Sequence, residues 1–373
     1  MSYLLSVVIP TKDRYPYLFQ LIELIMSFNS VEIELIVQDN TTDNSLFLEY
    51  MEKHSYKHLK YFHIKEQISV SANSTNAILN SSGEYVCFLG DDDGILSSIV
   101  DVVHYMKDMS IDYLISLPTI YNWPDFYDPS IFNLTSSISY HKGTGRFLKL
   151  NAMNEFYKSK SNGFDGLYKM PRVYQGLVSR SFLDKIYTKC NTFFPGPSPD
   201  MANSVALSML DGNFYLYDSP LFISGQCRNF GGGERLIGAN KLKRITEVNF
   251  LPKNITETWC VKLPTYWCAD TIWPESAIEA ICAMDQQFYV NFDKILARFI
   301  FNHLSYFKEC EGLISNKWSF TINFIVYSIR KIHSFLYHRL SYFLSKGNRL
   351  KKYYIVRNIH SIAGAVKYLE NVE

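Results

Sequence analysis

Four short apolar runs alternate with helix-like segments over about the first ninety residues of the chain. The runs lie at 4–9, 34–37, 59–64 and 85–89, and the segments between them at 17–28, 41–51 and 71–81. The runs are continuously apolar, which is typical of strands buried on both faces of a sheet. The order therefore predicts an α/β fold with a mostly parallel central sheet covered by helices on both sides.

The composition indicates a packed globular protein. Of 373 residues, 47% are hydrophobic and 20% charged, enough for one large domain with an accessory region or for two modest domains. The net charge of +1 and the lack of a binding motif argue against nucleic acid as a partner. Seven cysteines without a CxxC pair, no signal-peptide pattern and no long uncharged apolar window predict a cytoplasmic protein without disulfides or a spanning helix.

The rest of the chain divides into two stretches of different character. Short strands with Pro- and Gly-rich loops from 113 to 238 are typical of a substrate-facing half, while residues from 239 onward show amphipathic helical segments near 276–310, 318–345 and 349–369. We therefore expect a domain over 1–238, with halves 1–112 and 113–238. A helical region over 239–373 is expected to follow it.

Polar groups follow three of the four predicted strands. These are the segment 10–14 (PTKDR), the pair Asp39 and Asn40, and the triplet 91–93. Ligands of open α/β sheets bind beyond the carboxyl ends of the strands, so these groups are expected to converge on one edge. The chain has neither GxGxxG after its first strand nor a P-loop, which disfavours the usual dinucleotide and P-loop folds.

The three consecutive carboxylates Asp91, Asp92 and Asp93 need a neutralising partner if they are buried. Their oxygens are hard ligands of the kind that Mg²⁺ and Mn²⁺ prefer, which predicts a metal site that bridges to substrate phosphates. The alternative is a solvated turn, where Asp and Gly are common.

Four further residues each allow a functional and a structural interpretation. Asp39 either accepts hydrogen bonds from a base or ribose or is a helix N-cap or turn residue, and Asn73 is either a ligand contact or a cap. Arg14 either pairs with phosphate or is exposed. Arg228, beside the glycines at 231–233, either closes over phosphates or lies next to a loop that is only flexible.

Asp200 lies in a Pro- and Gly-rich loop just before an apolar helical segment. A first-turn or N-cap role would explain it without any chemistry. The functional alternative is a general base that accepts the proton of a substrate hydroxyl.

The C-terminal stretch 328–360 interleaves aromatic and aliphatic residues with Lys and Arg at helical spacing, and 328–373 contains nine Lys and Arg against two Glu. This composition is typical of a helix on an anionic membrane surface. The alternative is a helix that packs on the core or on another subunit, so a homo-oligomer through the C-terminal helices is a second expectation.

The segments 6–14 (SVVIPTKDR), 34–45 (ELIVQDNTTDNS) and 73–95, which ends in GEYVCFLGDDDGI, resemble family 2 glycosyltransferases of the GT-A fold. The first segment is similar to the family's P-T-x-N-R, with Asp13 where Asn is usual, and Gly90 stands where many members have the first Asp of the acidic motif. The motif then reads either as Asp91-x-Asp93 or as the pair Asp91–Asp92. The resemblance implies a nucleotide-sugar site made by Pro10, Thr11, Asp13, Arg14, Asp39, Asn40, Asn73, Asp91, Asp92 and Arg228, and a metal site at Asp91 and Asp93.

The resemblance also implies an activity. A sugar would pass from a nucleoside-diphosphate donor, UDP above all, to a hydroxyl of a glycan or lipid-linked acceptor. Mn²⁺ or Mg²⁺ would assist, Asp200 would be the base and the anomeric centre would invert. It implies bacterial surface-polysaccharide assembly at the inner face of the cell membrane. The alternatives are a non-catalytic sugar-nucleotide-binding or scaffold subunit, and a DxD phosphatase, which Gly94–Ile95 disfavours.

Overall fold

A computed structural model describes residues 3–126, 134–228, 242–344 and 353–372. Its larger sheet has eight strands in the order β3, β2, β1, β4, β10, β6, β11, β9. In that order they span Leu59–His63, Ile33–Asp39, Leu5–Thr11, Tyr85–Phe88, Gly176–Ser179, Tyr113–Ser116, Phe214–Tyr217 and Phe147–Leu150. β3, β2, β1 and β4 are mutually parallel, as predicted, whereas β10 and β9 run antiparallel to their neighbours.

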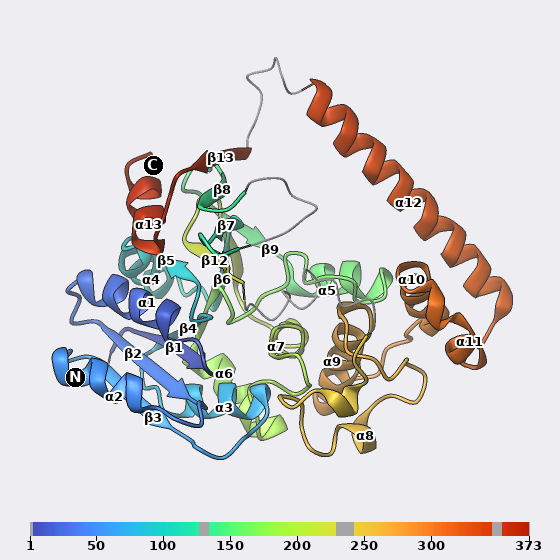
Figure 1. The fold of residues 1–373 in the computed structure, drawn as a ribbon, viewed down its shortest axis with the longest axis horizontal. Helices are drawn as coiled ribbons and strands as arrows, with labels where there is room; N and C mark the ends of the chain where they lie inside the picture. The colour runs from blue at the N-terminus through green and yellow to red at the C-terminus, as the bar shows by residue number, and fades with distance from the viewer. Residues whose placement is uncertain (1–2, 127–133, 229–241, 345–352, 373) are drawn as a thin grey trace.

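Neighbouring residues of each strand point to opposite sides of this sheet, so both of its faces carry apolar side chains. Helices cover both faces. Val7 and Ile9 of β1 join a core with α1 (Tyr15–Ser27), α2 (Ser45–Lys53) and α4 (Ile99–Asp108). Val8 joins a second core on the other face, with α3 (Val70–Leu79), α6 (Arg180–Cys190) and α7 (Pro199–Ser208). The predicted alternation of strands and helices over the first ninety residues is thus confirmed (Figure 1).

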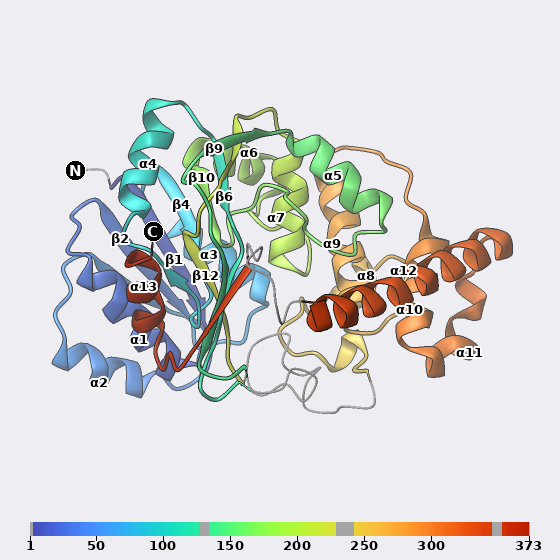
Figure 2. The ribbon, with the colours of Figure 1, turned by 90° about the horizontal axis from the view of Figure 1, so that it is seen from above.

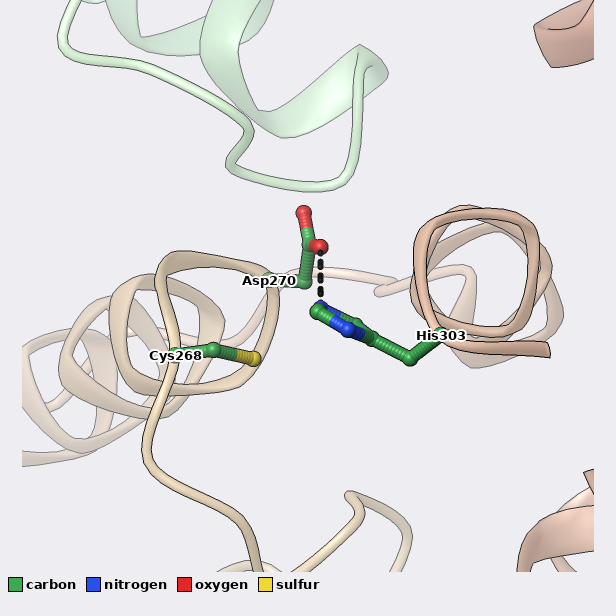
Figure 3. A group of neighbouring side chains, drawn as sticks. All are labelled: Cys268, Asp270 and His303. Carbon is green, nitrogen blue, oxygen red and sulfur yellow. Dashed lines mark ion pairs between the residues drawn. The ribbon is translucent and has the colours of Figure 1, made fainter. Parts of the chain in front are cut away.

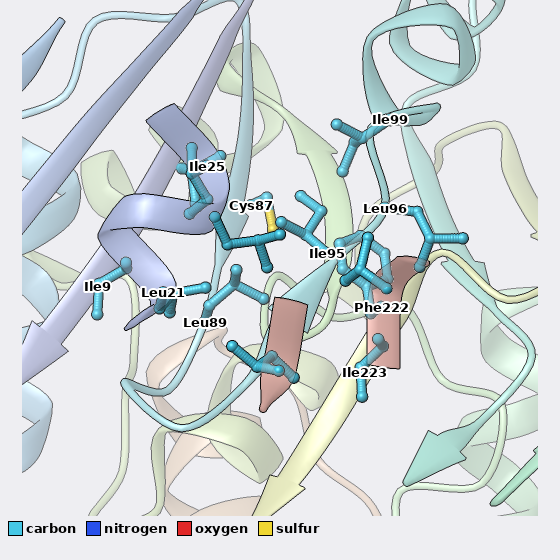
Figure 4. Close-up of a cluster of buried hydrophobic side chains, with 14 of the residues drawn as sticks. Ile9, Leu21, Ile25, Cys87, Leu89, Ile95, Leu96, Ile99, Phe222 and Ile223 are labelled. Atoms are coloured by element: carbon cyan, nitrogen blue, oxygen red, sulfur yellow. The ribbon is translucent and has the colours of Figure 1, made fainter. Parts of the chain in front are cut away.

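A second sheet joins distant parts of the chain. Its strands β13, β8, β7, β12 and β5 span Tyr353–Arg357, Ser137–His141, Thr119–Asn122, Phe222–Gln226 and Gly94–Ile95. β5 follows the acidic triplet directly and pairs with β12. Figure 4 shows the apolar core beneath this junction, to which α1 contributes Leu21 and Ile25, β5 contributes Ile95 and β12 contributes Phe222. The acidic triplet therefore lies between two sheets that share one core.

The end of the chain differs from the helix expected at 349–369. Residues Tyr353–Arg357 form β13, which pairs antiparallel with β8, and α13 (Ile362–Glu370) follows. Tyr-Tyr-Ile-Val is rich in aromatic and β-branched residues, which favour a strand where a free edge is available. α13 buries Ile362, Val366 and Leu369 in the first core, beside α1 and far from α8–α11 (Figures 1 and 2).

The helical expectation holds for most of the residues between 242 and 344. There the structure has α8 (Ile255–Thr258), α9 (Ala269–Ala283), α10 (Phe292–Asn302), α11 (Phe307–Cys310) and α12 (Lys317–Leu344). α9 packs on α7, while α5 (Ala152–Ser161) also contacts α7. Among the described helices, none combines the length and the apolar character that crossing a membrane requires. The division of the chain at residue 238 stays a prediction.

Candidate functional site

The carboxyl ends of β1 and β4 bring the first and third predicted loops together. Because the two strands are parallel neighbours, Thr11 at the end of β1 lies beside the turn that follows β4. The Thr11 hydroxyl donates a hydrogen bond to Asp91 Oδ2 over 2.7 Å. Pro10 precedes it within β1 and is half-buried. The predicted convergence at this edge is therefore present.

Arg14, at the N-cap of α1, lies against two of the three aspartates. Its Nε is 3.0 Å from Asp91 Oδ1, and its terminal nitrogen is 2.8 Å from Asp92 Oδ2. Burial alone would lower the pKa of Arg14, but the charges of Asp91 and Asp92 raise it above its usual value. Asp91 Oδ1 and Asp92 Oδ2 are buried and accept no hydrogen bond in this geometry. Both oxygens therefore form an ion pair with Arg14.

Asp93 is engaged differently from the other two. Its Oδ1 accepts hydrogen bonds from the Gly225 backbone N–H (2.9 Å) and from Gln175 Nε2 (3.0 Å), and its Oδ2 accepts one from the Gly90 N–H (2.7 Å). The side chain is fully buried. These bonds fix the turn between β4 and β5.

Burial raises the pKa of both flanking aspartates. The pKa of Asp91 rises to about 7 although Arg14 lowers it, and that of Asp93 also rises to about 7, with Asp92 adding to the effect of burial. Charging all three carboxyls together is costly without a further cation, because like charges at short range repel.

The turn is also held from the second sheet. Trp123 Nε1 donates to the Asp92 carbonyl over 2.9 Å. A Cβ on Gly225 would lie 1.7 Å from the same carbonyl oxygen, so this position requires glycine for the close approach of two backbones.

Asp39, at the end of β2, is fully buried and accepts three hydrogen bonds. Its donors are the hydroxyls of Tyr15 (2.6 Å) and Tyr61 (2.8 Å) and the backbone N–H of Thr41 (2.8 Å). Thr41 Oγ1 in turn accepts from the N–H of Asp13, whose φ of 57° is one that Asp and Asn tolerate better than most residues. The first two loops are therefore joined through Thr41.

The two asparagines of the predicted site differ in how completely they are bonded. Asn40 donates to the carbonyls of Ile64 (2.8 Å) and Glu66 (2.7 Å), so its amide holds the loop after β3. Asn73 donates to the Gln38 carbonyl (3.3 Å), and its buried Oδ1 accepts no hydrogen bond from the residues that the structure describes. The alternative that Asn73 caps a helix is wrong, because Ser69 is the N-cap of α3.

Asp200 lies in the first turn of α7, and Ser198 is the N-cap of that helix. Burial raises the pKa of Asp200 to about 6, against the lowering effect of the nearby Arg172 charge. Burial and the charges of Asp93, Asp200 and Asp92 raise the pKa of Tyr174 well above its usual value. Asp200 and the acidic triplet are thus both close enough to Tyr174 to raise its pKa, so the two predicted acidic sites lie near one common residue.

Arg228 is exposed and lies two residues after the end of β12. Its neighbour Cys227 is buried and accepts a hydrogen bond from Arg14 over 3.0 Å, so the segment reaches the acidic turn. The glycines at 231–233 lie outside the described residues.

Sequence reasoning missed Trp123, Tyr174, Gln175, Gly225 and Cys227. All come from elements more than twenty-five residues beyond the triplet and carry no motif, although Gly225 within a strand is a signal for close backbone approach.

A second cluster of titratable groups joins α9 to α10 (Figure 3). One ligand-type atom each of Cys268, Asp270 and His303 lies within 4.8 Å of the others. Asp270 accepts from Arg298 Nε (2.9 Å) and Asn302 Nδ2 (2.8 Å), and its Oδ2 is 3.5 Å from His303 Nε2. Burial lowers the pKa of His303, but Asp270 raises it more, to about 9. Without a bound ion, His303 is thus protonated at neutral pH, and Arg298, Asn302 and His303 surround Asp270 as an ion-pair network.

The mostly parallel sheet with its convergent polar edge has the GT-A type of α/β fold. The protein-family model described as "Glycosyl transferase family 2" matches residues 6–164. The match covers less than half of the chain, so the likeness to glycosyltransferase family 2 is one of residues 6–164.

A relative and two solved structures resemble parts of the chain. GalNAc(5)-diNAcBac-PP-undecaprenol beta-1,3-glucosyltransferase of Campylobacter jejuni is 31% identical to this chain over 102 residues. The matched region is 26% of this chain and about a third (33%) of the length of that relative. S. aureus TarS 1–349 in complex with UDP-GlcNAc has a TM-score of 0.49 at 14% identity, covering 86% of this chain and 78% of TarS. The complex with UDP has a TM-score of 0.45 at 16% identity, covering 81% and 72%.

Proposed function

We propose that this chain transfers a sugar from a nucleoside-diphosphate sugar, UDP above all, to a hydroxyl of a glycan or lipid-linked acceptor. The observation that carries the proposal is the pair of buried oxygens without hydrogen bonds, Asp91 Oδ1 and Asp92 Oδ2, at the carboxyl edge of a family 2 domain. A diphosphate with its counter-ion is the ligand chemistry that suits such a pair beside Arg14.

The donor's nucleoside would lie over the ends of β1 and β2. Asp39 offers carboxylate lone pairs there, and Asn73 Oδ1 is a buried acceptor without a partner. The Asp39 hydrogen bonds with Tyr15 and Tyr61 keep its carboxylate oriented before the donor arrives. Thr11, Asp13 and Arg14 line the same edge, with Arg14 and Arg228 available for the diphosphate.

The residues present fit Mn²⁺ or Mg²⁺ at Asp91 and Asp92. Their two unbonded oxygens converge on one cationic side chain, whereas both oxygens of Asp93 accept hydrogen bonds from the protein. We therefore propose that Asp91 and Asp92 bind the metal and that Asp93 shapes the turn. When bound, a divalent ion would supply stabilisation of the charge that develops on the leaving diphosphate.

Asp200 is proposed as the general base. A carboxyl with a pKa near 6 is ionised at neutral pH yet basic enough to accept the proton of an attacking hydroxyl. The hydroxyl oxygen forms the new bond to the anomeric carbon as the bond to the diphosphate breaks, and Asp200 retains the proton. A reaction that uses one base and forms no covalent bond to the protein is a single displacement, and it would invert the anomeric centre.

The acceptor and the location follow from the relative. Its name specifies an undecaprenol-diphosphate-linked acceptor. We extend that acceptor class to this chain, and with it assembly of a surface polysaccharide at the cytoplasmic face of the membrane.

The test begins with the donor. Thermal shifts with UDP-, GDP- and dTDP-sugars, with and without Mn²⁺, should show stabilisation by one nucleotide class that the metal strengthens. Asp91→Asn and Asp92→Asn should each lower donor hydrolysis or transfer by roughly 100-fold or more. Asp101→Asn, at an exposed position of α4, is the matched control and should have wild-type turnover.

Two outcomes would count against the proposal. Wild-type turnover in both Asp91→Asn and Asp92→Asn would exclude the metal assignment. Donor binding without any turnover in the native protein would favour the alternative, a sugar-nucleotide-binding or scaffold subunit.

A further inference from the structure

α12 is held to the rest of the molecule by one of its faces. The Phe301 ring of α10 lies 5.7 Å from Phe324 and 5.2 Å from Tyr327 between ring centroids, and Asn302 donates to the Tyr327 hydroxyl over 3.3 Å. Phe320 packs with Phe324 on the same side. Figure 1 shows the helix at the outer edge of the molecule, along α10.

The opposite face of α12 is apolar and exposed. At about 100° per residue, its apolar side chains fall within an arc roughly 120° wide. We call this set the α12 stripe: Trp318, Ile322, Ile325, Val326, Ile329, Ile332 and Leu336. Trp318 is 80% exposed, and Ile325, Ile329 and Ile332 are 51%, 60% and 59% exposed. Soluble surfaces rarely leave so continuous a stripe of large apolar side chains without a partner.

The charge of α12 favours an anionic lipid surface over a second copy of the chain as the partner of the α12 stripe. α12 contains Lys317, Arg330, Lys331 and Arg339 and no Asp or Glu. In a pair of such helices from two copies, the basic side chains would find no acidic partners, although paired helices generally rely on them for register. An anionic lipid surface supplies the missing negative charge. At about 100° per residue, Lys317 and Arg330 lie on either side of the α12 stripe, roughly 60° and 40° beyond its edges. Lys317 is exposed, and Arg330 is exposed while it donates to Asn162 Oδ1 over 3.0 Å.

We propose that α12 is a lipid-binding element that embeds the α12 stripe in the interface of an anionic membrane. Trp318 would sit at headgroup level, the position that Trp favours, while the isoleucines enter the boundary with the acyl chains. The inference rests on the proposed function in one respect: a lipid-linked acceptor would be presented at such a surface.

The experiment is vesicle co-sedimentation of the full chain. Wild-type protein should sediment with vesicles of 70% phosphatidylcholine and 30% phosphatidylglycerol, and much less with phosphatidylcholine alone or at high salt. The variant Ile325→Ser/Ile329→Ser/Ile332→Ser should bind the anionic vesicles at least about tenfold more weakly, because it loses most of the apolar area that enters the interface. Leu46→Ser/Leu48→Ser/Val261→Ser removes three exposed apolar side chains elsewhere and should bind like wild type.

Three results would overturn the proposal. One is equal vesicle binding by the α12 variant, and another is no binding by the native protein. The third is a native oligomer by light scattering that the α12 variant converts to monomer with no effect of vesicles, because the α12 stripe then covers a second copy. Thermal shifts with the donor separate the two proposals, since the α12 variant should keep donor binding even where lipid binding is lost.

Discussion

At the scale of single residues, the neighbouring acids of the triplet have different surroundings. Asp93 accepts hydrogen bonds from the N–H groups of Gly90 in its own turn and of two distant residues, Gln175 and Gly225, while Asp91 and Asp92 face Arg14. Three adjacent carboxylates in sequence therefore correspond to one turn-forming residue and two that offer free lone pairs. The difference arises because successive side chains in the turn point in different directions.

Arg14 is the counter-charge of two buried carboxylates, so its loss is expected to destabilise the metal-free protein. Arg14→Met should lower the free energy of unfolding by roughly 2–4 kcal/mol, because breaking a buried ion pair leaves uncompensated charge. Added Mn²⁺ should recover much of this loss. Urea unfolding with and without Mn²⁺ measures both effects.

Lys12→Met is the matched control, since it removes one positive charge two residues away. A similar loss of stability in both variants would mean that overall charge, not the ion pairs of Arg14, is responsible.

We expect the protonation of Asp200 to determine how kcat falls at acidic pH, the acid limb of the pH profile. With a pKa of about 6, the carboxyl is protonated below that pH and cannot accept the proton of the acceptor. The kcat of the native protein should therefore fall as the pH drops through about 6, and Asp200→Asn should lower kcat by roughly 10²–10⁴-fold with donor affinity unchanged. An unchanged acid limb in Asp200→Asn at residual activity would assign that limb to another group.

At the scale of elements, α9 and α10 are joined by the ion pairs of Asp270. His303 has a folded pKa of about 9, above its usual 6.5, so its contribution to stability is complete below about 6.5 and is lost as the pH rises through 9. Thermal melts should show the native protein losing roughly 1–2 kcal/mol over that interval. His303→Gln should lack this loss; parallel pH curves for the two proteins would contradict the assignment.

At the scale of the whole molecule, α13 near the end of the chain packs on α1 near its beginning. α13 fills the core beside α1, and Gly94 leaves room for it: a Cβ there would lie 2.7 Å from Ile362 Cδ1. The edge of the sheet that carries the candidate site is thus supported by α13, which follows α8–α12 in sequence.

Ending the chain at residue 345 should therefore damage a site whose residues all precede 229. Removal of β13 and α13 exposes the buried faces of Ile362, Val366 and Leu369, and each such side chain contributes roughly 1.5–3 kcal/mol when buried. We expect a lower melting temperature and loss of the thermal shift by UDP. Leu369→Ala should show a smaller loss of the same kind, and Lys367→Ala, exposed on α13, should show none. Native donor binding by the truncated chain would show that α13 is dispensable.

Much of the first half of the fold could be predicted from local pattern. Continuous apolar runs predicted β1–β4 because parallel strands are buried on both faces, and the polar residues after them had to meet at one edge. The predicted carboxyl ends of the four strands lie within one or two residues of the observed ones, and the same logic predicted that Asp39 and Asp91 stand at one edge of the sheet. β13 could not be predicted, because a strand next to a free edge depends on pairing with β8, some two hundred residues earlier.

The sequence by itself determined the parallel sheet, its polar edge and the acids that stand there, because each follows from short-range periodicity. Only the tertiary structure decided how each acid is neutralised, since the donors to Asp93 include Gln175 and Gly225 and the cation beside Asp91 and Asp92 comes from Arg14. It also decided that one face of α12 packs on α10 while the α12 stripe does not. These outcomes depend on contacts between distant segments, which no local pattern encodes.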